Sequence, residues 1–225
     1  MAATAAESGC ATRPSAPEVI ILIEQDPITV NEHRSLKELQ KLFGKRDAHP
    51  SGIYKGSIGA RWSTASGVKV EGSRTCIYLA RVEMTLRLEK PTIWLGSDLA
   101  GNRCVRESVW QHEIVHYRID QALLDRHAPL IEQAIREALR RTSGVTVSDQ
   151  REAKRASKQL ADAVDDAARW SIDNLNWERD SQQDSHDSPA EYARTGKACA
   201  DGNLGGSRPL ACDRRPGLCT RLDQP

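Results

Sequence analysis

The chain has 225 residues, and its 32 lysine and arginine residues against 31 aspartate and glutamate residues give a formal net charge of +1. A chain of this length can bury a hydrophobic core without disulfides, so its size permits an enzyme. The balanced charge argues against a general attraction to nucleic acid or anionic lipid, and no apolar run reaches the roughly 20 residues that a membrane helix needs. We therefore expect no nucleic-acid partner and no transmembrane span; the sequence indicates no particular oligomeric state.

Residues 1–17 contain small residues and two prolines without any periodic pattern, which predicts a disordered N-terminal tail. The tail lacks the charged and apolar regions of a secretory signal, so we expect no signal peptide within it. Ser8, Gly9 and Cys10 resemble the cleavage region of bacterial lipoproteins, but Glu7 stands where that pattern has an apolar residue. Export would therefore need a signal upstream of this start.

The first half of the folded region has the pattern of a sheet. An apolar run at residues 18–23 predicts a buried strand, and residues 35–43 predict a short helix with Ser35 as its cap. A glycine-rich turn is expected at residues 52–59. Strand-like segments follow at residues 60–64, 68–70, 75–88 and 92–95, and the third has strictly alternating apolar residues at Val82, Met84, Leu86 and Leu88. This pattern predicts an antiparallel meander.

From about Arg106 the apolar period becomes that of a helix. Its stripe stays in phase across Pro129, which favours one long kinked helix over two helices folded back at residues 125–128. Ser148 or Asp149 caps a second helix that runs to about Asp180. The sequence thus predicts an α+β domain over residues 18–198, an antiparallel sheet followed by a helical hairpin, with residues 199–225 as a Cys/Gly/Pro-rich C-terminal tail.

The first long helix contains the sequence HEIVH, which has the form HExxH. His112 and His116 are four residues apart, so both imidazoles project from one helix face and can reach one Zn²⁺ ion. Glu113 lies beside them, where it could take a proton from a metal-bound water. The motif therefore predicts a metal site, against the alternative of two structural histidines.

HEIVH resembles the signature of zincin metallopeptidases. The order of elements resembles a family of bacterial proteins of unknown function that are described as secreted zinc-dependent proteases, over roughly residues 19–198. The resemblance implies zinc, Glu113 as general base and hydrolysis of peptide bonds. The longer metzincin motif would need glycine at Ile119 and histidine at Ala122, so that subclass is excluded. The resemblance also implies a segment with His-Gly after the second helix. The corresponding segment of this chain is HDSPAEYARTGK, which contains no His-Gly.

A catalytic zinc needs a third protein ligand and an open position. A hairpin that turns near Val145 would place His112 beside Glu178 and His116 beside Asn174, with the chain after the second helix over the motif. The candidates, in order, are His186, Glu191 and Glu178. If the chain folded back at Pro129, Glu137 would approach instead. His127 is about 16 Å from His116 along a helix and cannot share the metal.

Two further expectations concern an oxyanion donor and the cysteines. Tyr192 or Tyr117 could donate a hydrogen bond to the oxyanion. The even number of cysteines favours disulfides, and we expect Cys76 to pair with Cys104, which implies a periplasmic or secreted protein. The alternative is two free thiols in the core of a cytoplasmic protein.

The sequence therefore favours a zinc metallopeptidase acting on a peptide or protein substrate. The alternative is a non-catalytic envelope protein with a structural metal site that acts as a binding module.

Overall fold

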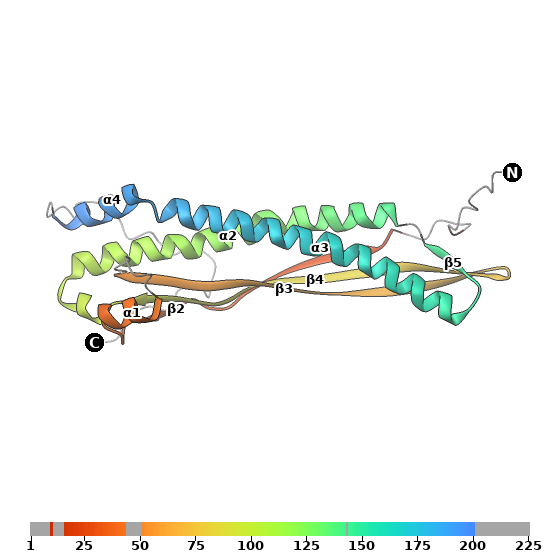
Figure 1. Ribbon diagram of the computed structural model, residues 1–225, viewed down its shortest axis with the longest axis horizontal. Coiled ribbons are helices and arrows are strands. Elements are labelled where there is room, and N and C mark those ends of the chain that lie inside the picture. The colour runs from red at the N-terminus through yellow and green to blue at the C-terminus, as the bar shows by residue number, and fades with distance from the viewer. Residues whose placement is uncertain (1–9, 11–15, 44–50, 143, 201–225) are drawn as a thin grey trace. The chain divides into compact units, whose positions relative to one another are not determined.

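The computed structural model describes residue 10 and residues 16–43, 51–142 and 144–200 (Figure 1). Its helices and strands confirm the α+β class. In chain order they are β1 (Glu18–Gln25), β2 (Thr29–Asn31), α1 (Leu36–Phe43), β3 (Gly52–Glu71), β4 (Arg74–Leu95), a short 3-10 helix η1 (Ser97–Gly101), α2 (Arg103–Arg141), β5 (Val145–Val147), α3 (Gln150–His186) and α4 (Pro189–Ala200).

The chain divides into two compact units, and the long elements β3, β4, α2 and α3 contribute residues to both. The first unit draws on Met1–Glu24, Gly59–Arg87 and Leu123–Glu178. The second draws on Gln25–Ile58, Leu88–Ala122 and Arg179–Pro225. The HExxH motif lies in the second unit.

The sheet is built around β4, which pairs with β1, β2, β3 and β5. Strand β2 runs parallel to β4, with Thr29 opposite Thr92, whereas β5 runs antiparallel to it, with Thr75 opposite Val147. The expectation of an antiparallel sheet is therefore wrong. Parallel pairing needs a crossover, and α1 and β3 lie between β2 and β4 in the chain. The alternation of apolar residues predicts which face of a strand is buried, but it does not predict whether neighbouring strands run parallel or antiparallel.

Strands β3 and β4 are longer than the expected segments. They are joined at Gly72 and Ser73, and Gly72 has a positive φ of 64°, which glycine adopts without strain. The glycine-rich turn expected at residues 52–59 is wrong, because those residues begin β3. A Cβ added to Gly52 would lie 2.5 Å from Cγ1 of Val109, so this glycine serves the close approach of strand and helix.

The alternation in β4 is confirmed. Val82, Met84, Leu86 and Leu88 are fully buried, and they supply much of the apolar area that stabilises the sheet against the helices. Within the described residues, no helix is both long enough and apolar enough to span a bilayer.

The first long helix is continuous, as expected, with Pro129 inside it. It begins after Asn102, whose Oδ1 accepts the backbone N–H of Val105 at 3.2 Å as a cap. Glu137 was expected to approach the HExxH motif only if the chain folded back at Pro129, and it does not fold back there. Glu137 pairs instead with Arg140 and Arg141 of its own helix.

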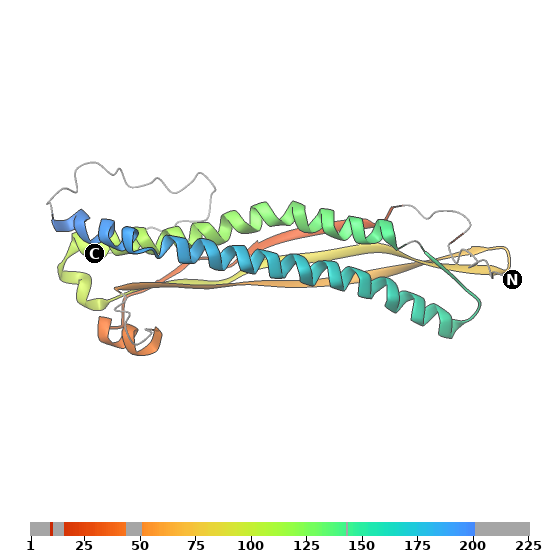
Figure 2. The same cartoon turned by 45° about the horizontal axis from the view of Figure 1, so that its top comes forward.

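The second long helix begins at Gln150 and is capped by Asp149, whose Oδ1 accepts the N–H of Glu152 at 2.8 Å. It runs to His186, six residues beyond the expected end. In two views, α4 lies beside the start of α2 within the second unit (Figures 1 and 2).

The expected disulfide between Cys76 and Cys104 is wrong. Cys76 is bonded to Cys10 in the first unit, and Cys104 is bonded to Cys199 in the second. The remainder of the two expected tails lies largely outside the described residues, although Cys199 and Ala200 belong to α4.

Candidate metal centre

The HExxH motif lies on the part of α2 that belongs to the second unit. His112, Glu113 and His116 are all buried, with exposed fractions of 5%, 5% and 6%. The i, i+4 spacing places the two imidazoles on one face, and their Nε2 atoms are 3.3 Å apart. Two buried ring nitrogens at this distance are arranged as ligands of one ion would be.

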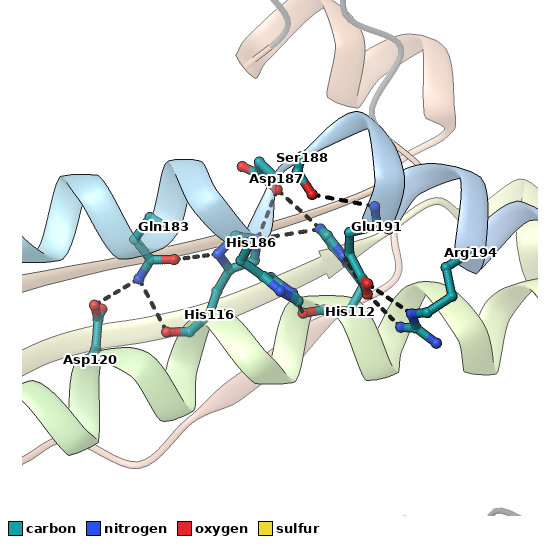
Figure 3. A network of polar contacts seen from close by, with 9 residues as sticks. All are labelled: His112, His116, Asp120, Gln183, His186, Asp187, Ser188, Glu191 and Arg194. Carbon is teal, nitrogen blue, oxygen red and sulfur yellow. Dashed lines mark hydrogen bonds and ion pairs between the residues drawn. The ribbon is translucent and has the colours of Figure 1, made fainter.

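His186 completes a cluster of three histidines (Figure 3). Potential ligand atoms of His112, His116 and His186 all lie within 4.8 Å of one another. The ring of His186 stacks on that of His112 with centroids 4.4 Å apart. His186, the first of the three candidates for the third ligand, therefore lies at the motif, because α3 extends as far as His186.

Gln183 determines which nitrogen of His116 faces the cluster. Its Nε2 donates hydrogen bonds to Oδ1 of Asp120 at 2.9 Å and to the carbonyl of His116 at 3.2 Å. The amide oxygen of Gln183 is therefore turned to Nδ1 of His116, which must be the protonated nitrogen. The lone pair of His116 is left on Nε2, which faces His112.

A backbone carbonyl orients His186 in the same way. Nε2 of His186 donates to the carbonyl oxygen of His112 at 3.1 Å, and a carbonyl can only accept. Nδ1 of His186 is then the nitrogen with a lone pair. Burial lowers the pKa of His186, although its hydrogen bond to the carbonyl of His112 opposes the shift, and the nearby His112 and His116 lower the pKa further. The lowered pKa favours the neutral form.

Asp120 anchors the network behind His116. It is fully buried and accepts hydrogen bonds from Tyr54, Arg179 and Gln183, with the shortest at 2.7 Å from Nε of Arg179. Asp120 is four residues after His116, so it lies on the same helix face. That spacing was present in the sequence, and sequence reasoning missed it, together with Gln183 and Arg179.

Glu113 lies on the β3 side of α2. Its carboxylate accepts the backbone N–H of Tyr54, and Gly52 packs so closely that an added Cβ would lie 3.0 Å from its Oε1. Desolvation raises the pKa of Glu113 to about 7, although the nearby His116 and His112 oppose the shift. A carboxyl with this pKa can exchange a proton near neutral pH.

The other sequence candidates take different positions. Glu191 Oε1 lies 3.8 Å from Nδ1 of His112, and its carboxylate is paired with Arg194. Oε2 of Glu178 lies within hydrogen-bonding distance of Nε2 of His127, at 2.7 Å, in the first unit. Tyr117 is buried, and its hydroxyl accepts a hydrogen bond from Gln121 at 2.9 Å. The side chain of Tyr192 lies outside the described part of the chain. The three-histidine cluster includes none of these.

The donor set fits zinc. Three imidazole nitrogens are a common set of zinc ligands, and the hydrogen bonds of neutral His116 and His186 leave one ring nitrogen of each with a lone pair for a metal. The amide of Gln183 and the carbonyl of His112 are the outer partners that metal-binding histidines usually have.

No protein-family model, curated protein or solved structure matches the chain. The resemblance to zincin-type metallopeptidases rests on the HExxH motif and the order of elements in the sequence.

Proposed function

We propose that this chain is a zinc-dependent peptidase whose centre is held by His112, His116 and His186. The observation that supports the proposal is the convergence of three buried or half-buried histidines next to a buried glutamate with a raised pKa. A bound zinc would polarise a peptide carbonyl and lower the pKa of a water at the site.

Glu113 acts as the general base in this proposal. Its carboxylate accepts a proton from the attacking water and passes it to the leaving amine. A pKa of about 7 suits both steps, since the group is neither fully ionised nor fully protonated at neutral pH. Tyr192 remains the proposed hydrogen-bond donor to the oxyanion.

The proposed place of action is the periplasm or the exterior of the cell. Two disulfides, Cys10–Cys76 and Cys104–Cys199, support it, because such bonds persist in oxidising compartments.

The test is the substitution Glu113→Gln. Glutamine is nearly isosteric and is not required as a ligand, so the variant should keep its zinc. Cleavage of a mixed peptide library, followed by mass spectrometry, should fall by about 10²- to 10⁴-fold, the typical cost of losing a positioned acid–base group. Equal cleavage by the wild type and by zinc-loaded Glu113→Gln would defeat the catalytic assignment.

A second candidate is a binding module with a non-catalytic metal site. The position of Asp187 favours it, since its Oδ1 lies 3.1 Å from Nε2 of both His112 and His116. A permanent four-ligand site would have no open position. In that case metal removal would lower stability, while no peptide in the library would be cut.

A further inference from the structure

We infer that Asp187 is a fourth metal ligand of this centre, and that it is displaceable. The inference rests on the metal site of the proposed function. Asp187 directly follows His186, in the short connection between α3 and α4. Its Oδ1 lies 3.1 Å from Nε2 of His112 and 3.1 Å from Nε2 of His116 (Figure 3).

These atoms form a triangle of the size that a metal requires. The third side, between the two Nε2 atoms, is 3.3 Å. Ligands placed tetrahedrally at about 2.0 Å from zinc are about 3.3 Å from one another. Asp187 Oδ1 and the two nitrogens therefore match three corners of one tetrahedron, and His186 is the candidate for the fourth.

Oδ1 of Asp187 is also chemically suited to bind a metal ion. In neutral His116 the lone pair lies on Nε2, because Nδ1 donates a hydrogen bond to Gln183. Without a metal, a proton on this nitrogen can bond Oδ1 of Asp187, and a metal ion can take the place of that proton. A metal ion at this point would bind both atoms, and carboxylate oxygens bind zinc at nearly the same distance as imidazole nitrogens.

The surroundings of Asp187 make it the ligand that can leave. Its side chain is 43% exposed, whereas those of His112 and His116 are 5% and 8% exposed. All three histidines lie on helices, and outer hydrogen bonds orient His116 and His186. The backbone N–H of Asp187 donates a hydrogen bond to the carbonyl of Gln183, and its side chain reaches the histidines from the partly exposed side of the cluster. An incoming zinc-binding group can therefore take its place without moving α2 or α3.

The experiment compares Zn²⁺ affinity in the wild type, Asp187→Asn and Asp187→Ala, measured by competition with a chromophoric chelator. Co²⁺-loaded samples report the coordination through their visible absorption. Asp184→Asn is the matched control, because Asp184 is an exposed aspartate one turn earlier on α3. Circular dichroism checks that each variant is folded.

Loss of a ligand should lower Zn²⁺ affinity by at least the 10- to 100-fold seen for outer partners of a metal site. The Co²⁺ spectrum should change in both Asp187 variants and stay unchanged in Asp184→Asn. Acetohydroxamate should bind more tightly to the loaded Asp187 variants, because no carboxylate competes with it. Wild-type affinity and an unchanged spectrum in Asp187→Ala would overturn the inference.

The outcomes separate this inference from the proposed function. If the Asp187 variants behave as expected but no protein cuts the peptide library, the ligand assignment stands and the peptidase fails. If the wild type binds zinc and cuts peptides while Asp187→Ala is indistinguishable in affinity and spectrum, the inference alone fails. If the wild type binds neither Zn²⁺ nor Co²⁺, both are overturned.

Discussion

At the scale of single residues, the arrangement around His116 is decided by one amide. The amide oxygen of Gln183 accepts a hydrogen bond from Nδ1 of His116, and its Nε2 donates hydrogen bonds to Asp120 and to the carbonyl of His116. Desolvation lowers the pKa of His116, but hydrogen bonds to Asp187 and Gln183 outweigh it, so the net shift is upward. The amide therefore sets both the orientation and the tautomer of a ligand.

Replacing Gln183 should weaken metal binding without removing a ligand. In Gln183→Ala, His116 loses its acceptor and can rotate or change tautomer, so Zn²⁺ affinity should fall by about 10- to 100-fold. Chelator competition measures this. Gln133→Ala, at an exposed glutamine of α2, should leave the affinity unchanged. Equal affinities of the two variants would show that Gln183 has no orienting role.

Glu113 should make the stability of the metal-free protein depend on pH. Its pKa is raised from 4.5 to about 7, so the folded state holds a proton that the unfolded chain has released between these values. Stability due to this group is present below pH 4.5 and is lost as the pH rises through about 7. The loss amounts to about 3 kcal/mol.

Urea unfolding at pH 5 and pH 8 tests this expectation. The wild type should lose more stability between the two values than Glu113→Gln, which cannot ionise at this position. The comparison cancels the contributions of the other titrating groups. Identical pH dependence in both proteins would mean that Glu113 is not buried as described.

At the scale of elements, the start of β3 is shaped by its contact with α2. Gly52 lies against Val109 and Glu113, and an added Cβ would be 2.5 Å from Cγ1 of Val109. The glycine lets the strand approach the helix and brings the backbone N–H of Tyr54 to the carboxylate of Glu113. The strand therefore helps to place the proposed base.

Gly52→Ala should destabilise the protein by about 1–3 kcal/mol, the usual cost of overpacking. It should also lower peptide cleavage, because the added methyl group would press on the side chains of both Val109 and Glu113. Gly101→Ala is the matched control, since an added Cβ there has no neighbour within 4 Å. Chemical denaturation and the library assay give the two readouts; equal stability of both variants would contradict the close approach.

The two long helices pair with a different register from the one expected. A turn near Val145 would have set His116 beside Asn174, but His116 contacts Gln183. Strand β5 lies between the helices in the chain and pairs with β4, so α2 and α3 are not joined by a tight turn. This offset brings His186, rather than Glu178, to the motif.

At the scale of the whole molecule, each unit contains one disulfide. Cys104–Cys199 joins the start of α2 to the end of α4, and the connection that carries His186 and Asp187 lies within the loop it closes. Cys10–Cys76 ties the N-terminal segment to β4. Both bonds restrict the unfolded chain, because they join positions 95 and 66 residues apart.

Removing Cys104–Cys199 with a double serine substitution should lower the free energy of unfolding by about 2–5 kcal/mol. It should also reduce Zn²⁺ affinity, since α4 and the Asp187 connection lose a covalent anchor. The same change at Cys10 and Cys76 should lower stability while leaving Zn²⁺ affinity unchanged. Peptide mapping of the non-reduced protein checks the pairing; a Cys76–Cys104 peptide would contradict it.

Much of the local structure and part of the site could be predicted from the sequence. The alternation in β4, the continuity of α2 across Pro129 and the pairing of His112 with His116 depend on periods of two and 3.6 residues, which local sequence contains. Helix caps at Ser35 and Asp149 are local in the same way.

The tertiary structure decided the remainder, because those features join residues distant in sequence. His112 and Asp187 are separated by 75 residues, and His116 and Gln183 by 67. The parallel pairing of β2, the disulfide partners and the helix register depend likewise on how distant segments meet. The periodicity of side chains does not show which distant segments come together. The HExxH motif could therefore be found in the sequence, whereas the groups that surround it were decided by tertiary packing.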